Sequence, residues 1–132
     1  MQLKPEKHLY EYAVMRYVPD VERGEFVNVG LIMLCKRQRW LKMKVELPED
    51  KLALYRCPHS IEEIERQLKG FTDLATDSIM ADRNKLAEFP AEERFRWITA
   101  QKSACLQTSR PHPGMTADLE ATFNKLFATL VE

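Results

Sequence analysis

Residues 16 to 30 read RYVPDVERGEFVNVG and place a short loop, dense in Arg, Asp and Glu, between two apolar segments. The segment before the loop, residues 9–18, is rich in aromatic and β-branched residues, and the segment after it, residues 26–35, is apolar on both faces. Both compositions are typical of β-strands. Because only a short loop joins them, we predict an antiparallel hairpin whose second strand is central in a sheet.

The rest of the chain predicts an α+β fold. Residues 40–47 alternate between apolar and polar side chains, as a third strand does, and residues 106–110 are a candidate fourth strand before the breaker-rich segment 111–114. Three kinds of signal predict helices: proline and acids in a first turn, the capping pair Ser60 and Glu63, and apolar residues spaced three and four apart. The predicted helices are 49–56, 61–80, 90–102 and 117–131. We therefore expect one domain, residues 1–132, with an antiparallel meander sheet of three to four strands packed against three to four helices.

Composition limits the classes of function. The 132 residues carry 20 Lys and Arg and 20 Asp and Glu, so no overall field attracts the chain to nucleic acid. The three cysteines form no CxxC spacing, which favours a reducing compartment, and no apolar run has the length of a membrane span. No signal peptide is visible either. We expect a cytoplasmic protein without a membrane association and without a cofactor.

Counting back from the loop gives a register for the hairpin. With Val18 opposite Phe26, Arg16 lies opposite Asn28. Simple alternation then puts residues 30, 32 and 34 of the second strand on the same face, together with Leu41, Met43 and Val45 of the third. This register predicts that the Arg16 and Asn28 face of the sheet packs against the helices.

The charged residues in and beside the loop have a structural interpretation. Asp20 caps a turn and pairs with Arg23, Gly24 supplies a positive φ, and Arg16 binds Glu25 beside the core. In this interpretation the charges hold the hairpin together. Ion-pair networks of this kind are common in proteins without a functional role.

The same charged residues have a functional interpretation, in which they face a ligand. Arg16 and Arg23 would bind a phosphate or a carboxylate, and Asn28 would recognise a polar edge. Charged loops on rigid strands are where binding groups tend to occur. If the fourth strand pairs beside the first, Arg110 could join them. The candidate ligand-binding residues are Arg16, Asp20, Arg23, Glu25, Asn28 and Arg110.

At this point the residues resemble a known family. The segments 16–20, 23–30, 95–97 and 106–109, with Pro113-Gly114, are similar to a prokaryotic family catalogued as domain of unknown function 3037. The resemblance covers most of the chain, but the family has no established activity. It implies a small bacterial protein whose gene sometimes neighbours that of a kinase of the toxin–antitoxin type.

Two other constellations are weaker. Arg37, Arg39, Lys42 and Lys44 surround Trp40 and form a candidate nucleic-acid patch, although a solvated hairpin tip explains them as well. Four further residues have side chains that zinc accepts, but their spacing fits no known finger, so we expect no metal site: Cys57, His59, Cys105 and His112.

The functional expectation is a non-catalytic binding or accessory module that acts through the charged loop 19–25. Its partner would be another protein, such as the product of a neighbouring kinase gene, and nucleic acid is a weaker candidate. The alternative is a small metal-dependent enzyme that cleaves phosphodiesters, similar to a nuclease, with Asp20 and Glu25 as ligands of Mg²⁺. The sequence does not choose between these two classes.

Overall fold

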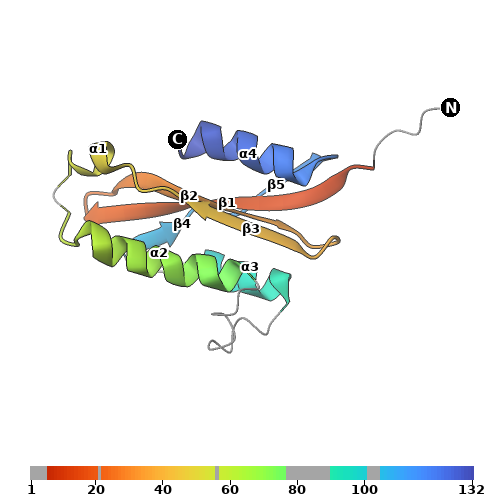
Figure 1. The fold of residues 1–132 in the computed structure, drawn as a ribbon, viewed down its shortest axis with the longest axis horizontal. Helices are drawn as coiled ribbons and strands as arrows, with labels where there is room; N and C mark the ends of the chain where they lie inside the picture. Colours follow the sequence, from red (N-terminus) through yellow and green to blue (C-terminus); the bar gives the residue numbers. More distant parts are fainter. Residues whose placement is uncertain (1–5, 21, 56, 77–89, 101–104) are drawn as a thin grey trace.

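The computed structural model describes residues 6–20, 22–55, 57–76, 90–100 and 105–132. The described residues form a five-stranded antiparallel sheet and four helices, which confirms the α+β prediction. Figure 1 shows three layers, with α4 on one face of the sheet and α2 and α3 on the other. The elements in chain order are β1 (His8–Asp20), β2 (Glu25–Cys35), β3 (Trp40–Val45), α1 (Glu49–Leu52), α2 (Ile61–Ala75), α3 (Ala91–Thr99), β4 (Leu106–Thr108), β5 (His112–Thr116) and α4 (Leu119–Leu130).

The long strand β1 organises the sheet. One of its edges pairs with β2, which pairs in turn with β3. Its other edge is divided between two short strands, because β4 pairs with Met15–Tyr17 and β5 pairs with His8–Tyr12. The strand β5 was not predicted, since its residues 112–114 were interpreted as a breaker. A proline is tolerated here because an edge strand does not need every backbone N–H for the ladder.

Ser109 joins the two short strands. Its backbone N–H donates to the Val14 carbonyl oxygen at 2.8 Å, and its side-chain Oγ accepts from the Val14 backbone N–H at 2.9 Å. Ser109 is buried, so without this hydroxyl the Val14 N–H would lack an acceptor between β4 and β5. The serine therefore continues the ladder where the chain passes from one strand to the next.

Gly114 lies opposite Tyr10 in the β1–β5 pair. A Cβ added at this glycine would overlap the phenol ring and the hydroxyl of Tyr10. The tyrosine ring thus lies directly across the glycine backbone, an arrangement known to support glycines in edge strands. Gly114 is required by this close approach.

A β-bulge in β2 overturns part of the predicted register. Arg16 does pair with Asn28, but Met15 pairs with Gly30, so Val29 is an extra residue on β2. Beyond the bulge Gly30 faces the side of Met15 and Val45, and an added Cβ there would meet Val45 Cγ1 at 2.9 Å. The prediction that residues 30, 32 and 34 share the face of Arg16 and Asn28 is wrong.

The face covered by α2 and α3 carries the larger core. It includes Met15, Tyr17 and Ile32 from the sheet and Leu68 and Phe95 from the helices. Leu41, Met43 and Val45 of β3 lie on this face, not on the face of Arg16 and Asn28 as predicted. The bulge explains the difference, because it transfers the apolar half of β2 to this side.

The helices agree with the predicted positions except at their ends. Ser60 Oγ accepts from the Glu63 backbone N–H at 3.2 Å, which is the predicted N-cap of α2. The helix α1 ends at Leu52, short of the predicted residue 56, because the N–H groups of Leu54 and Tyr55 bond carbonyls only three residues back. The predicted extensions 77–80 and 101–102 lie outside the described residues.

The other face of the sheet packs against α4 through Phe123 and Phe127, with Val14, Leu31 and Met33 beneath them. Asp118 caps this helix, since its Oδ1 accepts from the Ala121 backbone N–H at 3.0 Å. Both faces of the sheet are therefore covered. Among the helices that the structure describes, none has the length and the apolar character needed to traverse a bilayer.

Candidate functional site

The charged loop 19–25 is ordered by local interactions. Asp20 Oδ1 accepts from the Glu22 backbone N–H at 3.0 Å, and Gly24 adopts a φ of 72°, as predicted. The predicted pairing of Arg23 with Asp20 is wrong. Arg23 pairs with Glu25, with 2.9 Å between Nη2 and Oε1. Both partners of this ion pair are exposed, so it contributes little to stability.

Arg16 lies over an aromatic ring and not beside an acid. Its guanidinium carbon is 4.2 Å from the centre of the Phe26 ring, which is a cation–π contact. The expected ion pair with Glu25 is not formed, because Glu25 binds Arg23. Within the described part of the chain, the buried Nε of Arg16 has no hydrogen-bond acceptor. Arg16 therefore keeps its charge beside the hairpin without a carboxylate from those residues.

Asn28 is tied to the last turn of α4. Its Nδ2 donates to the Leu130 carbonyl oxygen at 2.9 Å, so the side chain satisfies one of the free carbonyls at the end of the helix. Its Oδ1 is buried and has no donor among the residues that the structure describes. Asn28 thus connects the hairpin to α4 through one of the two polar atoms of its side-chain amide.

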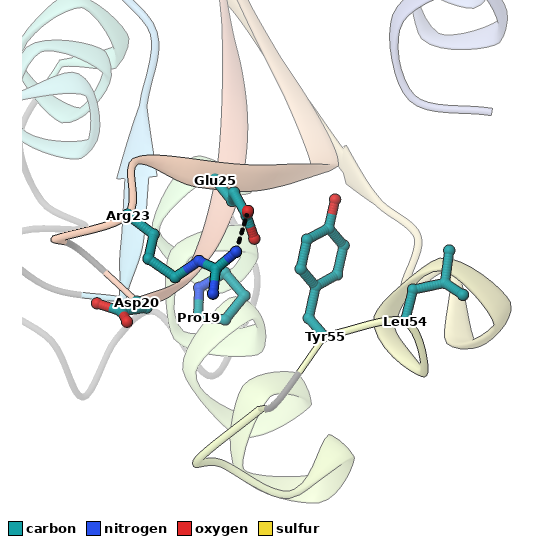
Figure 2. A pocket seen from close by; sticks show the side chains of 6 residues that line it. All are labelled: Pro19, Asp20, Arg23, Glu25, Leu54 and Tyr55. Carbon is teal, nitrogen blue, oxygen red and sulfur yellow. Dashed lines mark hydrogen bonds and ion pairs between the residues drawn. The ribbon is translucent and has the colours of Figure 1, made fainter.

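A cleft of about 350 Å³ opens beside the loop. Figure 2 shows the Arg23 side chain extending toward Glu25 on one side of the cleft, with Tyr55 on the other side. The Asp20 carboxylate points away from Tyr55. Tyr55 and its neighbour Leu54 come from the turn after α1, which the fold brings next to the hairpin. Three of the candidate residues, Asp20, Arg23 and Glu25, line this cleft.

A second cleft of about 220 Å³ lies against the first and shares Leu54 and Tyr55 with it. It adds Phe26 and Asn28 from β2, Lys51 from α1 and Leu130 from α4. We call the two clefts together the hairpin-end groove. Leu54 is 83% exposed and Phe26 is 45% exposed, so large apolar side chains face solvent in this groove.

Lys51, Leu54 and Tyr55 were missed by sequence reasoning. They are near the loop only because the chain returns to this end of the sheet after β3, a tertiary effect that local patterns do not reveal. One signal was present: Leu54 lies inside the predicted helix 49–56 but does not share the three-residue apolar spacing of Leu52 and Tyr55.

Arg110 does not join the other candidates. It follows Ser109, which pairs with Val14, and the chain then runs along β1 toward His8. Arg110 is therefore level with the middle of β1, roughly 20 Å along the strand from Pro19. The structure brings together Asp20, Arg23 and Glu25, places Arg16 and Asn28 next to them, and separates Arg110.

The candidate nucleic-acid residues fall into two groups: Trp40, Lys42 and Lys44 contact α4, and Arg37 and Arg39 lie in the β2–β3 turn. Trp40 packs edge to face on Phe123 with 6.3 Å between ring centres. Lys42 pairs with Glu120 at 2.6 Å, and Lys44 Nζ lies 4.5 Å from the centre of the Phe127 ring. These side chains extend along the apolar face of α4 with their charged ends outward. Arg37 and Arg39 remain exposed in the β2–β3 turn.

The acids of the loop do not form a cation site. Among the described residues, no group of three or more His, Cys, Asp or Glu side chains is placed to hold a metal ion. Asp20 caps the turn and Glu25 binds Arg23, so both carboxylates already have partners. The geometry gives no support to Mg²⁺ ligation by Asp20 and Glu25.

A polar cluster inside the core surrounds Tyr17. The Tyr17 hydroxyl lies 3.2 Å from His59 Nδ1 in a hydrogen bond. Burial, followed by the nearby thiols of Cys57 and Cys105, raises the pKa of Tyr17 to about 12. Burial also raises the pKa of Cys105, so its thiol is a poor nucleophile. This cluster is a satisfied part of the core.

Comparison with known proteins gives one match. The model of a family described as "Protein of unknown function (DUF3037)" matches residues 12–131. No curated protein and no solved structure matches the chain. The match begins within β1, at Tyr12, continues through α4 and includes the whole hairpin-end groove.

Proposed function

Since the chain belongs to this family of proteins of unknown function, we propose from its own geometry that it is a non-catalytic binding module that holds another protein in the hairpin-end groove. The observation that carries the proposal is the exposure of Leu54 and Phe26 in a groove that Arg23 and Lys51 also line. Arg16 lies against the ring of Phe26. Apolar side chains inside a charged rim are the usual composition of a protein-binding surface.

The chemistry of the groove favours a protein segment with both apolar and acidic groups. Aromatic and arginine side chains contribute most of the energy in protein interfaces, and Phe26, Tyr55 and Arg23 are of these kinds. Arg16 adds a cation that no described acid neutralises. A carboxylate of the partner would therefore find Arg16 or Arg23, while its apolar side chains would cover Leu54.

Nucleic acid is less well supported as the partner. Trp40, the aromatic residue of the candidate nucleic-acid patch, packs against Phe123. Its neighbours Lys42 and Lys44 lie over the rings of Phe123 and Phe127 in α4. Trp40 is half-buried in its contact with Phe123, which leaves less of its ring for a base to stack on. The proposal therefore names a protein, and a kinase encoded nearby is one candidate.

Site-specific photo-crosslinking in the producing cell tests the proposal. A benzophenone side chain in place of Leu54 should crosslink to a protein, which mass spectrometry can identify. The same group in place of Arg66, an exposed residue of α2, is the control and should not give that product. Leu54 is exposed, so its replacement should leave the melting temperature unchanged.

A charge variant makes the test specific. Arg23→Ala in the Leu54-labelled chain should reduce the crosslinked product several-fold, because the partner loses a charged contact. Arg66→Ala is the matched control and should have no effect. Equal crosslinking from both labelled positions, or a product that nuclease treatment removes, would contradict a protein partner in the groove.

A further inference from the structure

A separate cleft lies at the opposite end of the sheet. It has a volume of about 550 Å³ and is formed where the start of β1, the end of β5 and the β2–β3 turn meet. Figure 1 shows the start of β1 at the end of the molecule away from the β1–β2 hairpin. We call it the far-end cleft, and the described residues that line it are Lys7, His8, Leu9, Lys36, Arg37 and Met115.

The floor of the far-end cleft is apolar. Leu9 and Met115 lie directly opposite each other on β1 and β5, and each is 61% exposed. Leu9 continues the face of Ala13 and Met15, which α2 and α3 cover farther along the strand. An exposed cross-strand pair of large apolar residues in a hollow is a surface that a partner side chain can fill.

The rim of the cleft is positive. Its described lining contains Lys7, Lys36 and Arg37 and no carboxylate. Two described acids pair with these cations, and they differ. Glu6 is 3.9 Å from Arg37 with both groups well exposed, whereas Glu92 is mostly buried and binds Lys36 at 3.0 Å and Arg96 at 2.6 Å. An exposed pair such as that of Glu6 and Arg37 contributes little and is readily exchanged. Arg37 is thus available to a carboxylate from outside, and Lys36 is not.

We propose that the far-end cleft docks an acidic segment of a partner protein, with a large apolar side chain between Leu9 and Met115 and carboxylates at Lys7 and Arg37. Charge complementarity selects an acidic occupant, and the apolar floor selects one with an apolar anchor. Nucleic acid fits less well, because the floor offers Leu and Met where bases need aromatic faces. A membrane fits less well, because the apolar pair lies in a hollow.

Selection from a random peptide library on the full chain tests this inference. Enriched peptides should carry acidic residues on both sides of a large apolar one. Their affinity, measured by fluorescence polarisation, should fall at least about tenfold for Arg37→Glu and for Met115→Asp. Arg37 is in a turn, so that variant remains informative even if Met115→Asp loosens β5.

Two controls separate this cleft from other surfaces. Lys125→Glu reverses an exposed charge on α4 and should leave the affinity unchanged. Leu54→Asp alters the hairpin-end groove, so a loss of affinity in that variant would place the peptide there and would overturn the inference. Enriched peptides without acids, or equal affinity for Arg37→Glu and the unmodified chain, would overturn the inference. The inference would also fail if Arg37→Glu and Met115→Asp abolished self-association of the chain, or its binding to phosphatidylglycerol vesicles, and left peptide binding unchanged.

Discussion

Beside the hairpin, Arg16 lacks the carboxylate that its place in the sequence suggested, and its neighbours explain why. Glu25 is taken by Arg23, and Asp20 is taken by the turn that it caps. The guanidinium therefore lies over Phe26, whose ring face attracts a cation without needing a charge. Arg16 is stabilised modestly in this state, and no acid of the described residues pairs with it.

This environment predicts a small effect of Arg16→Ala on stability. We expect the free energy of unfolding to fall by about 1 kcal/mol or less, the value of an exposed cation–π contact. Urea denaturation measures it, and Phe26→Leu, which removes only the ring, should show a similar loss. The two effects should not add, because both variants break the same contact. A loss of several kcal/mol for Arg16→Ala would mean that a buried acid pairs with it.

Tyr17 predicts a pH dependence of stability. Its pKa is raised from 10.0 to about 12 in the folded chain, so the neutral phenol is favoured by folding. The stabilisation is fully present below pH 10 and is lost as the pH rises to about 12. We expect this contribution to reach about 2 to 3 kcal/mol, at 1.4 kcal/mol for each pKa unit.

Comparison with Tyr17→Phe isolates that contribution. The free energy of unfolding of the variant should change less with pH over the same interval. Other tyrosines and the lysines affect both proteins equally, so they cancel in the comparison. The ultraviolet absorbance of tyrosinate should also show one tyrosine that ionises later than the rest in the unmodified chain. A Tyr17→Phe stability curve parallel to that of the unmodified chain would disprove the burial effect.

At the scale of the element, the edge of β1 depends on one hydroxyl. Ser109→Ala removes the acceptor of the Val14 N–H, and a buried donor left unsatisfied costs about 1 to 3 kcal/mol. Hydrogen exchange should be faster at the Val14 amide in this variant. Ser109→Thr keeps the hydroxyl and should protect that amide. If the Val14 amide exchanges equally in both variants, the side-chain bond is not what protects it.

Elements were predictable from the sequence where local pattern decides them, and not where an irregularity does. The strands β1 to β3 and the start of α2 follow from alternation and capping. Gly30, an isolated glycine inside a strand pattern, was a signal for the bulge beside it. The bulge was missed because its extra residue, Val29, is an ordinary strand former. That one residue reversed the face of every later position in β2.

The strand β5 and the groove residues show two further reasons for failure. Pro113 and Gly114 are breakers in most settings, yet an edge strand tolerates the first and Tyr10 requires the second. Leu54 and Tyr55 belong to the groove only through the return of the chain after β3. Asp20, Arg23 and Glu25 were found because they are neighbours in the sequence as well as in space.

At the scale of the whole molecule, the two candidate surfaces lie at opposite ends of one strand. Leu9 and Pro19 are both in β1, roughly 33 Å apart at the rise of a β-strand. The hairpin-end groove combines aromatic and mixed charges, whereas the far-end cleft is apolar with a positive rim. Under the two proposals above, a partner at each end would be held without contact between them.

The close approach of Tyr10 to Gly114 has a consequence for how relatives of this protein diverge. A mutation that adds a side chain at position 114 forces the Tyr10 ring to move from its place, and this cost is absent once position 10 has changed to a smaller residue. The two positions, a hundred residues apart in the sequence, should therefore co-vary through evolution. Lineages that lose the glycine should be those that have already lost the aromatic ring.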